Sequence, residues 1–132
     1  MSAGDILYVQ RILRKLPVSD HVVDYAVNLA RATRPREPGT PQFINDWLTW
    51  GAGPRAAQYL VLGAKATALL NGRLNVSCDD VRRVVKPVLR HRIFTNFNAD
   101  AENIGPDQVV ERLVGAVPET SAEQYAREAE AV

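Results

Sequence analysis

Apolar residues recur at steps of three and four positions in several stretches of the sequence, with charged residues between them. This period is typical of amphipathic helices. It predicts a helix over residues 6–16 that Pro17 ends, and a second helix over residues 19–34 with Ser19 as its N-cap. A third helix of this kind is predicted over residues 106–117.

The strongest helical pattern covers residues 54–70. Pro54 suits the first position of a helix and Gly53 the capping position before it, while the dipeptide Asn71-Gly72 is a stop signal. Apolar side chains occur on nearly every side of this helix. We therefore expect it to be central and buried.

Another helix is predicted to follow Ser77 and to reach Leu89. Asp80 stands three residues after Ser77, which is a variant of the capping box, in which side chains and backbone exchange hydrogen bonds. Pro87 lies inside this helix and removes one of its hydrogen bonds, so we expect a kink or a weak point there.

A long connection, residues 35–53, joins the second helix to the helix that starts at Pro54. Its prolines and Gly39 predict a loop in the first half, whereas residues 43–50 are rich in large apolar side chains. Long connections are often functional. Two interpretations of Trp47 and Trp50 are open: packing over the end of the long helix, or docking to another domain or subunit, since aromatic residues are enriched at interfaces.

The predicted fold class is all-α, a small bundle of about five helices. No stretch alternates apolar and polar residues long enough to predict a strand, although residues 72–76 could pair briefly. A chain of 132 residues has room for one domain. We place it in residues 1–118 and expect residues 119–132 to form a flexible C-terminal tail, because they carry little apolar surface.

The amino-acid composition indicates which broad class of protein this is. A content of 46% hydrophobic and 23% charged residues is that of a globular domain rather than a disordered one. The single cysteine, Cys78, cannot form an internal disulfide, and with only two histidines no metal site is predicted. Neither a membrane-spanning segment nor a secretory signal is recognisable, so the expected location is the cytoplasm.

The net charge of +1 conceals an uneven distribution. Residues 55–94 carry eight Lys or Arg against two acids, whereas residues 95–132 carry two against eight. Arg82, Lys86 and Arg90 form a basic stripe at four-residue spacing. This stripe could pair with the acidic end of the chain or meet a phosphate-bearing partner. The second interpretation supports an alternative function, that of a small all-α nucleic-acid-binding module.

The candidate chemistry lies in one turn. The sequence contains no G-x-x-x-x-G-K-[ST] loop, no H-E-x-x-H and no G-x-S-x-G motif, so the chain alone is predicted to catalyse nothing. The segment Gly51-Ala52-Gly53-Pro54-Arg55 leads a glycine-rich turn into a helix and places an arginine in its first turn. The positive end of the helix dipole disfavours a cation there, unless an anion meets it.

This segment resembles the sensor-2 motif in the helical lid domain of MoxR-type AAA+ ATPases, which usually reads Gly-Ala-Ser-Pro-Arg. Gly53 stands where the family usually has serine, and the aromatic segment 43–50 is longer than its pattern leads us to expect. Three other segments resemble the same family: residues 25–34, which end in a Thr-Arg pair, residues 75–81, a capped helix start, and residues 88–97, a closing signature.

The resemblance implies a lid packed beside a nucleotide-binding core that is not in this chain. Arg55 would contact the γ-phosphate of ATP as the sensor-2 arginine, and Gly53 and Pro54 would shape the turn that presents it. The core would hold ATP and Mg²⁺, so the chain alone would bind no cofactor. We interpret the chain as a lid separated from that core.

The resemblance has implications for the whole protein as well. It implies an ATPase with chaperone-like activity that couples ATP binding and hydrolysis to conformational change. Its partners would be the nucleotide-binding core, neighbouring subunits of a hexameric ring and proteins with von Willebrand factor A domains. Neither a membrane nor a nucleic acid is an expected partner.

Overall fold

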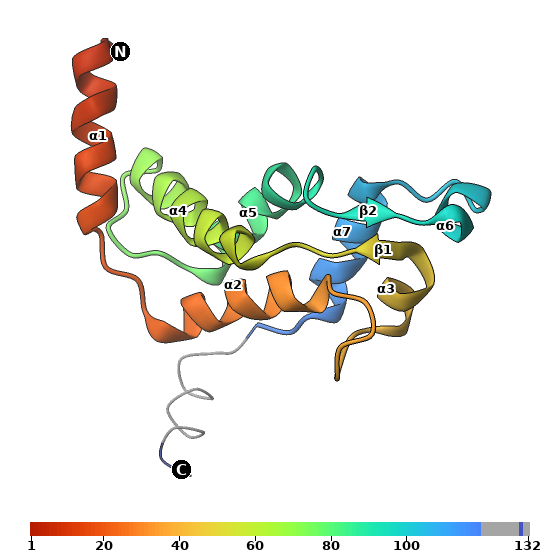
Figure 1. Ribbon diagram of the computed structural model, residues 1–132. Helices are drawn as coiled ribbons and strands as arrows, with labels where there is room; N and C mark the ends of the chain where they lie inside the picture. Colours follow the sequence, from red (N-terminus) through yellow and green to blue (C-terminus); the bar gives the residue numbers. More distant parts are fainter. Residues whose placement is uncertain (120–129, 131–132) are drawn as a thin grey trace.

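The computed structural model describes residues 1–119 and residue 130, most of which lie in helices (Figure 1). The elements are, in chain order, α1 (Ala3–Lys15), α2 (Asp20–Ala32), α3 (Gln42–Trp47), β1 (Leu48–Trp50), α4 (Pro54–Leu70), α5 (Cys78–Leu89), β2 (Phe94–Thr95), α6 (Phe97–Ala101) and α7 (Pro106–Ala116).

The helical fold class and the five longer helices are confirmed, with ends close to the predicted ones. Two short helices, α3 and α6, were not predicted. The expected pairing of residues 72–76 is wrong, because this segment forms turns and bends. The two-stranded antiparallel sheet of the described residues instead joins β1 to β2, with Leu48 opposite Thr95 and Trp50 opposite Phe94.

The core lies where α2, α4, α5 and α7 meet. Helices α4 and α5 approach each other closely at Gly63, where a Cβ atom would lie 3.1 Å from the side chain of Val84. An alanine at this position would require the Val84 side chain to shift by a few tenths of an ångström. The end of the molecule away from α1 holds the sheet together with α3 and α6 (Figure 1).

Only one side of α4 is buried, which corrects the prediction of a helix covered all round. The buried positions are spaced four residues apart along one face: Ala56, Leu60, Ala64 and Ala68. On the opposite face, Tyr59 and Leu62 are each 41% exposed and Leu70 is 71% exposed. The helix therefore carries more apolar side chains than the described part of the chain buries.

Helix α5 begins with the predicted capping box. The backbone N–H of Asp80 donates to the Ser77 hydroxyl, and the Ser77 backbone N–H donates to the Asp80 carboxylate at 2.9 Å. Arg73 donates two hydrogen bonds to this buried carboxylate and holds its pKa below the ordinary range. The exposed Pro87 is accommodated inside the helix.

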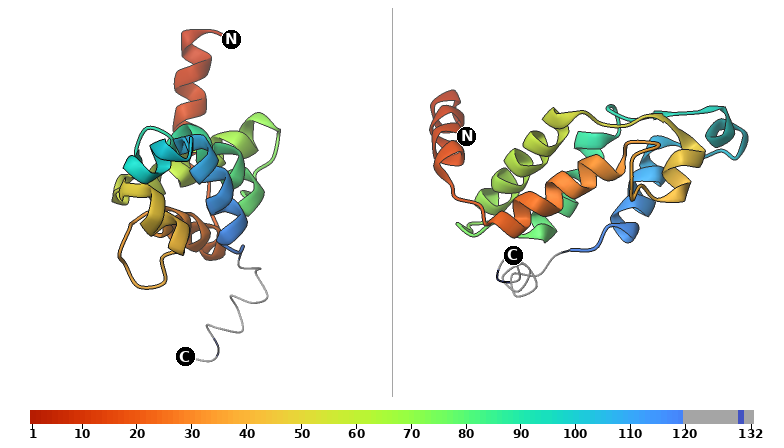
Figure 2. Two further views of the ribbon diagram at one scale, coloured as in Figure 1. Left: turned by 90° about the vertical axis from the view of Figure 1, so that its right-hand side faces the viewer. Right: turned by 60° about the horizontal axis from the view of Figure 1, so that its bottom comes forward.

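Helix α1 also begins with a capping box, formed by Ser2 and Asp5. None of its residues is buried, and it projects beyond the other helices while still contacting α4 (Figure 2). Within residues 1–119, no helix has the length and apolar character needed to cross a membrane. The tail predicted over residues 119–132 falls, apart from residues 119 and 130, outside the described residues.

Candidate functional site

The predicted site residues lie together where the chain enters α4. Gly53 is the N-cap, in extended conformation, and Pro54 occupies the first helical position. No side chain caps the helix, and its first turn contains no acidic residue. Arg55 follows on the exposed surface. Because the first N–H groups of a helix and its dipole both favour negative charge, this end of α4 attracts an anion.

The end of α2 holds the turn before α4 in place. Thr33 is completely buried, and its hydroxyl accepts a hydrogen bond from the Ala52 backbone N–H at 2.8 Å while donating to the Ala30 carbonyl at 2.6 Å. Arg34 donates from Nε to the Ala52 carbonyl at 3.0 Å. The backbone N–H and the carbonyl of Ala52 are thus both hydrogen-bonded to the Thr33-Arg34 pair, which we call the α2 latch.

Gly51 is required by the close approach of the two segments at the α2 latch. A Cβ atom at this position would lie 2.3 Å from the Thr33 carbonyl oxygen and 2.7 Å from the Arg34 Cα, distances at which atoms clash. At Gly53, by contrast, a Cβ atom would meet nothing within 4 Å. The first glycine is therefore fixed by packing, whereas the second leaves room for the serine found in the usual motif.

Arg55 itself makes no ion pair and no side-chain hydrogen bond with any residue of the described part of the chain. A rigid backbone thus carries a cation that nothing in residues 1–119 neutralises. A phosphate oxygen suits this position, since a guanidinium donates in a planar fork that matches it. The sequence motif identified Arg55, but it did not reveal that Thr33 and Arg34 support it.

Comparison with known proteins agrees with this geometry. The family model described as the AAA lid domain matches residues 44–113, which include the turn, α4 and α5. The chain belongs to the AAA lid domain family. The match includes residues 44–50, which are most of the aromatic segment.

The relatives place this lid domain in the MoxR type. It is 36% identical over 124 residues to the chaperone MoxR1 of Mycobacterium tuberculosis, covering 92% of this chain and 33% of that protein. It is 27% identical over 113 residues to the uncharacterized protein YeaC of Bacillus subtilis, covering 86% and 32%. The lid domain thus spans about a third of the length of these relatives.

A solved structure shows the same fold. The crystal structure of a putative ATPase from Cytophaga hutchinsonii matches with a TM-score of 0.81 and 34% identity, over 89% of the lid domain and 36% of that chain.

The basic stripe of the lid domain is paired internally. Arg82 bonds to Glu119 at 2.5 Å and Arg90 lies 3.2 Å from Asp107, while Lys86 pairs with Glu111. The hydrogen bond to Glu119 raises the pKa of Arg82 further above its ordinary value. Of the two interpretations left open by the sequence, the structure supports pairing with the acidic end.

The two tryptophans of the lid domain have different surroundings. Trp47 is half-buried, packs on Phe43 at 5.9 Å between ring centroids, and donates from Nε1 to Glu102 at 3.2 Å. Arg112 lies over both rings. Trp50, next to the glycine turn, is 69% exposed. Trp47 is therefore packed, although against Phe43, Glu102 and Arg112 rather than over the end of α4, whereas Trp50 is accessible.

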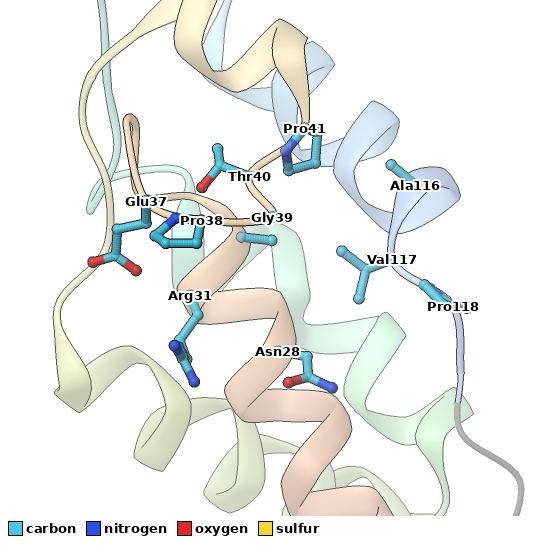
Figure 3. A pocket seen from close by; sticks show the side chains of 11 residues that line it. Asn28, Arg31, Glu37, Pro38, Gly39, Thr40, Pro41, Ala116, Val117 and Pro118 are labelled. Carbon is cyan, nitrogen blue, oxygen red and sulfur yellow. The ribbon is translucent and has the colours of Figure 1, made fainter. Parts of the chain in front are cut away.

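A pocket of about 320 Å³ lies elsewhere, between the end of α2, the loop around Gly39 and the end of α7 (Figure 3). Its polar lining includes Asn28, Arg31 and Glu37, and none of the predicted site residues borders it.

Cys78 is buried, which raises its pKa to about 11 and makes it a poor nucleophile. Residues 1–119 contain no group of His, Cys, Asp and Glu side chains suited to a metal ion.

Proposed function

We propose that this lid domain closes over ATP bound to the nucleotide-binding core of a MoxR-type AAA+ ATPase, and that Arg55 is its sensor-2 arginine. The observation that carries the proposal is an exposed guanidinium without a described partner, at a helix N-terminus whose backbone is locked by the α2 latch. A cation left without a partner on a rigid support fits a ligand that arrives from outside.

The chemical role follows from the charge of the phosphate chain. When a phosphoryl group is transferred, negative charge spreads over its oxygens, and a positioned guanidinium stabilises that distribution. Arg55 would contribute this stabilisation and would also register the loss of the γ-phosphate. Motion of the turn would then pass to α2 and α4 through the α2 latch. Mg²⁺ and the attacking water belong to the core.

The family resemblance extends the proposal to the assembly. The complete protein would be a cytoplasmic, chaperone-like ATPase whose subunits form a hexameric ring and act with proteins that carry von Willebrand factor A domains. The 132-residue chain alone would not hydrolyse ATP, since its sequence lacks a phosphate-binding loop. The paired basic stripe gives no support to nucleic-acid binding as a second function.

The decisive experiment changes Arg55 in the protein in which this lid is joined to its core. Arg55→Ala should lower kcat for ATP hydrolysis by roughly 10- to 1,000-fold, because one charge-assisted contact to the transition state is lost. Arg55→Lys should restore only part of the rate, since an ammonium lacks the planar fork. Steady-state ATPase rates and nucleotide affinities measure both effects.

Two controls separate this role from a structural one. Arg83→Ala removes another exposed arginine, one that pairs with Asp79 on α5, and should leave the ATPase rate unchanged. In the isolated chain, Arg55→Ala should change the free energy of unfolding by no more than about 0.5 kcal/mol. An Arg55→Ala protein that hydrolyses ATP at the parental rate would contradict the sensor role, and an unfolded isolated variant would show that the residue is structural.

A further inference from the structure

The pocket at the end of α2 has no part in the proposed function. It lies between α2, the loop around Gly39 and the end of α7, and its volume of about 320 Å³ is within the range of ligand pockets, roughly 300–1,000 Å³. In Figure 3, Asn28 and Arg31 lie below the loop, while Val117 and Pro118 lie beside it. The pocket is thus bounded on three sides, by a helix, a loop and the end of a second helix.

The loop that forms one wall of this pocket has a fixed conformation. The Thr40 hydroxyl donates to the Arg34 carbonyl at 2.8 Å. Arg36 and Gly39 have positive φ angles of 67° and 78°. Arginine adopts a positive φ rarely, and here its backbone N–H is held by a hydrogen bond to the Asn45 side chain at 2.6 Å. The wall is therefore formed before any ligand arrives.

Arg31 and Asn28 supply polar groups to the pocket. They stand three residues apart on α2, so they are neighbours on one face of the helix. In the described part of the chain, neither side chain makes a hydrogen bond, and Arg31 makes no ion pair. Glu37, the acidic residue of the lining, lies 4.0 Å from Arg34, which offsets its charge. The pocket therefore presents a guanidinium that no carboxylate of the described residues neutralises.

The end of a peptide chain has the chemistry that this lining recognises. A guanidinium donates to a carboxylate through two parallel hydrogen bonds, and a carboxamide such as that of Asn28 both donates to and accepts from a peptide group. Much of the remaining lining is apolar and suits an apolar side chain: Ala32, Pro38, Pro41, Ala116, Val117 and Pro118. A chain that ends in an apolar residue offers a carboxylate, an amide and an apolar side chain together.

We propose that this pocket binds the C-terminus of a partner protein whose last residue is apolar, with Arg31 as the residue that holds the terminal carboxylate. Because the pocket is bounded on three sides, a chain end fits it better than a segment that must enter and leave. The inference is independent of the role proposed for Arg55, which lies outside the pocket.

Nuclear magnetic resonance of the isolated, ¹⁵N-labelled chain tests the site with a small probe. N-acetyl-L-leucine carries the carboxylate, the amide and the apolar side chain, whereas N-acetyl-L-leucinamide lacks the negative charge. The first compound should shift the backbone amide signals of Arg31, Gly39 and Val117. The second should bind at least about tenfold more weakly, because a charge-assisted hydrogen bond is lost. Equal binding of the two compounds would overturn the proposal, as would the absence of shifts at these residues.

Substitutions in the pocket test the assignment of Arg31. Arg31→Gln should weaken the binding of N-acetyl-L-leucine by about tenfold, and Arg31→Lys should weaken it less because the charge is kept. The matched control Arg11→Gln removes an exposed arginine of α1 and should leave the affinity unchanged. Unchanged affinity in a folded Arg31→Gln chain would overturn the assignment.

Glu37→Gln provides a second test that does not alter Arg31. The substitution removes a negative charge from the lining, so the affinity for N-acetyl-L-leucine should rise. An unchanged or lower affinity would contradict the placement of the carboxylate in this pocket.

Two further compounds test whether the carboxylate must end a chain. N-acetyl-glutamyl-leucinamide carries its carboxylate on a side chain and should bind more weakly than N-acetyl-L-leucine. Inorganic phosphate should leave the signals of the pocket unchanged. Equal or tighter binding of the glutamyl compound would overturn the assignment of a chain end. Displacement of N-acetyl-L-leucine by phosphate would also overturn it, since the pocket would then bind anions in general.

Discussion

The turn before α4 and the basic stripe of α5 both present cations at the surface, but they differ in whether those cations are paired with acidic residues. Each of the three stripe residues has an acidic partner from the C-terminal part of the chain. Arg55 has none among residues 1–119, although the turn before it is held by a hydrogen bond from Ala52 to the buried Thr33. Judged by the number of basic residues, the stripe would be the better anion-binding site. Because those residues are already paired, the turn before α4 is the better one.

The physical reason for this difference is whether each cation already has a carboxylate partner within the fold. A cation that already donates to a carboxylate must give up that pair before it binds a second anion, at a cost of about 0 to 1 kcal/mol for each exposed pair. A cation that lacks a partner and is rigidly placed can bind an anion without that cost. Arg73 is a third case, since it serves the buried Asp80 and stabilises the start of α5.

The largest effect is expected at the α2 latch. Gly51→Ala forces a methyl group against the Thr33 carbonyl, so the turn must move, and we expect a loss of about 3 kcal/mol in the free energy of unfolding of the isolated chain. Gly115→Ala is the matched control, because a Cβ atom there meets nothing within 4 Å. Chemical denaturation measures both variants. A Gly51→Ala protein as stable as the control would show that the α2 latch does not fix the turn.

A smaller effect is expected at Asp80, together with a change in pH dependence. Hydrogen bonds from Arg73 lower the pKa of Asp80 below its ordinary value of 3.8. The charged form therefore stabilises the fold above about pH 4, and this stability is lost as the pH falls through the lower pKa of the folded state. Asp80→Asn should cost about 2 kcal/mol at pH 7.

Unfolding curves between pH 2 and pH 7 test this prediction. The difference between Asp80→Asn and the unmodified chain should shrink as the pH falls. A difference that is the same at every pH would contradict a role for the ionised carboxylate.

The basic stripe offers a direct test of the pairing argument. The unmodified chain should bind duplex DNA only weakly at low salt and not at physiological salt. Replacing the three acidic partners, in the variant Asp107→Asn, Glu111→Gln, Glu119→Gln, should strengthen low-salt binding about tenfold. With three cations released, the log-log slope of the binding constant against salt should steepen by roughly 2.7. Micromolar binding by the unmodified chain at physiological salt would instead support the nucleic-acid-binding module.

The smallest effect is expected at Gly53. Gly53→Ser restores the usual residue of the motif in open space and provides a side-chain cap for α4. The gain should be a few tenths of a kcal/mol in the free energy of unfolding, because glycine is itself a tolerated N-cap. Thermal unfolding of the isolated chain measures it. A loss of stability would mean that the turn depends on glycine at both positions.

The predicted helices were correct wherever local signals are strong. Pro54 and the Asn71-Gly72 pair set the ends of α4, and Ser77 with Asp80 set the start of α5, because caps and prolines act over three or four residues. The short elements α3, β1, β2 and α6 were missed. Pairing of Leu48 with Thr95 joins segments far apart in the chain, and so few residues carry no period of their own.

The sequence alone determined which arginine begins the long helix, because the turn, the proline and the helix are neighbours along the chain. Only the tertiary structure decided what surrounds it. Thr33 reaches Ala52 across 19 positions, and Arg82 reaches Glu119 across 37. Contacts of this kind depend on how whole helices pack, which no local pattern encodes. The same reason explains α4: its composition showed apolar residues on every side, but packing left one side open.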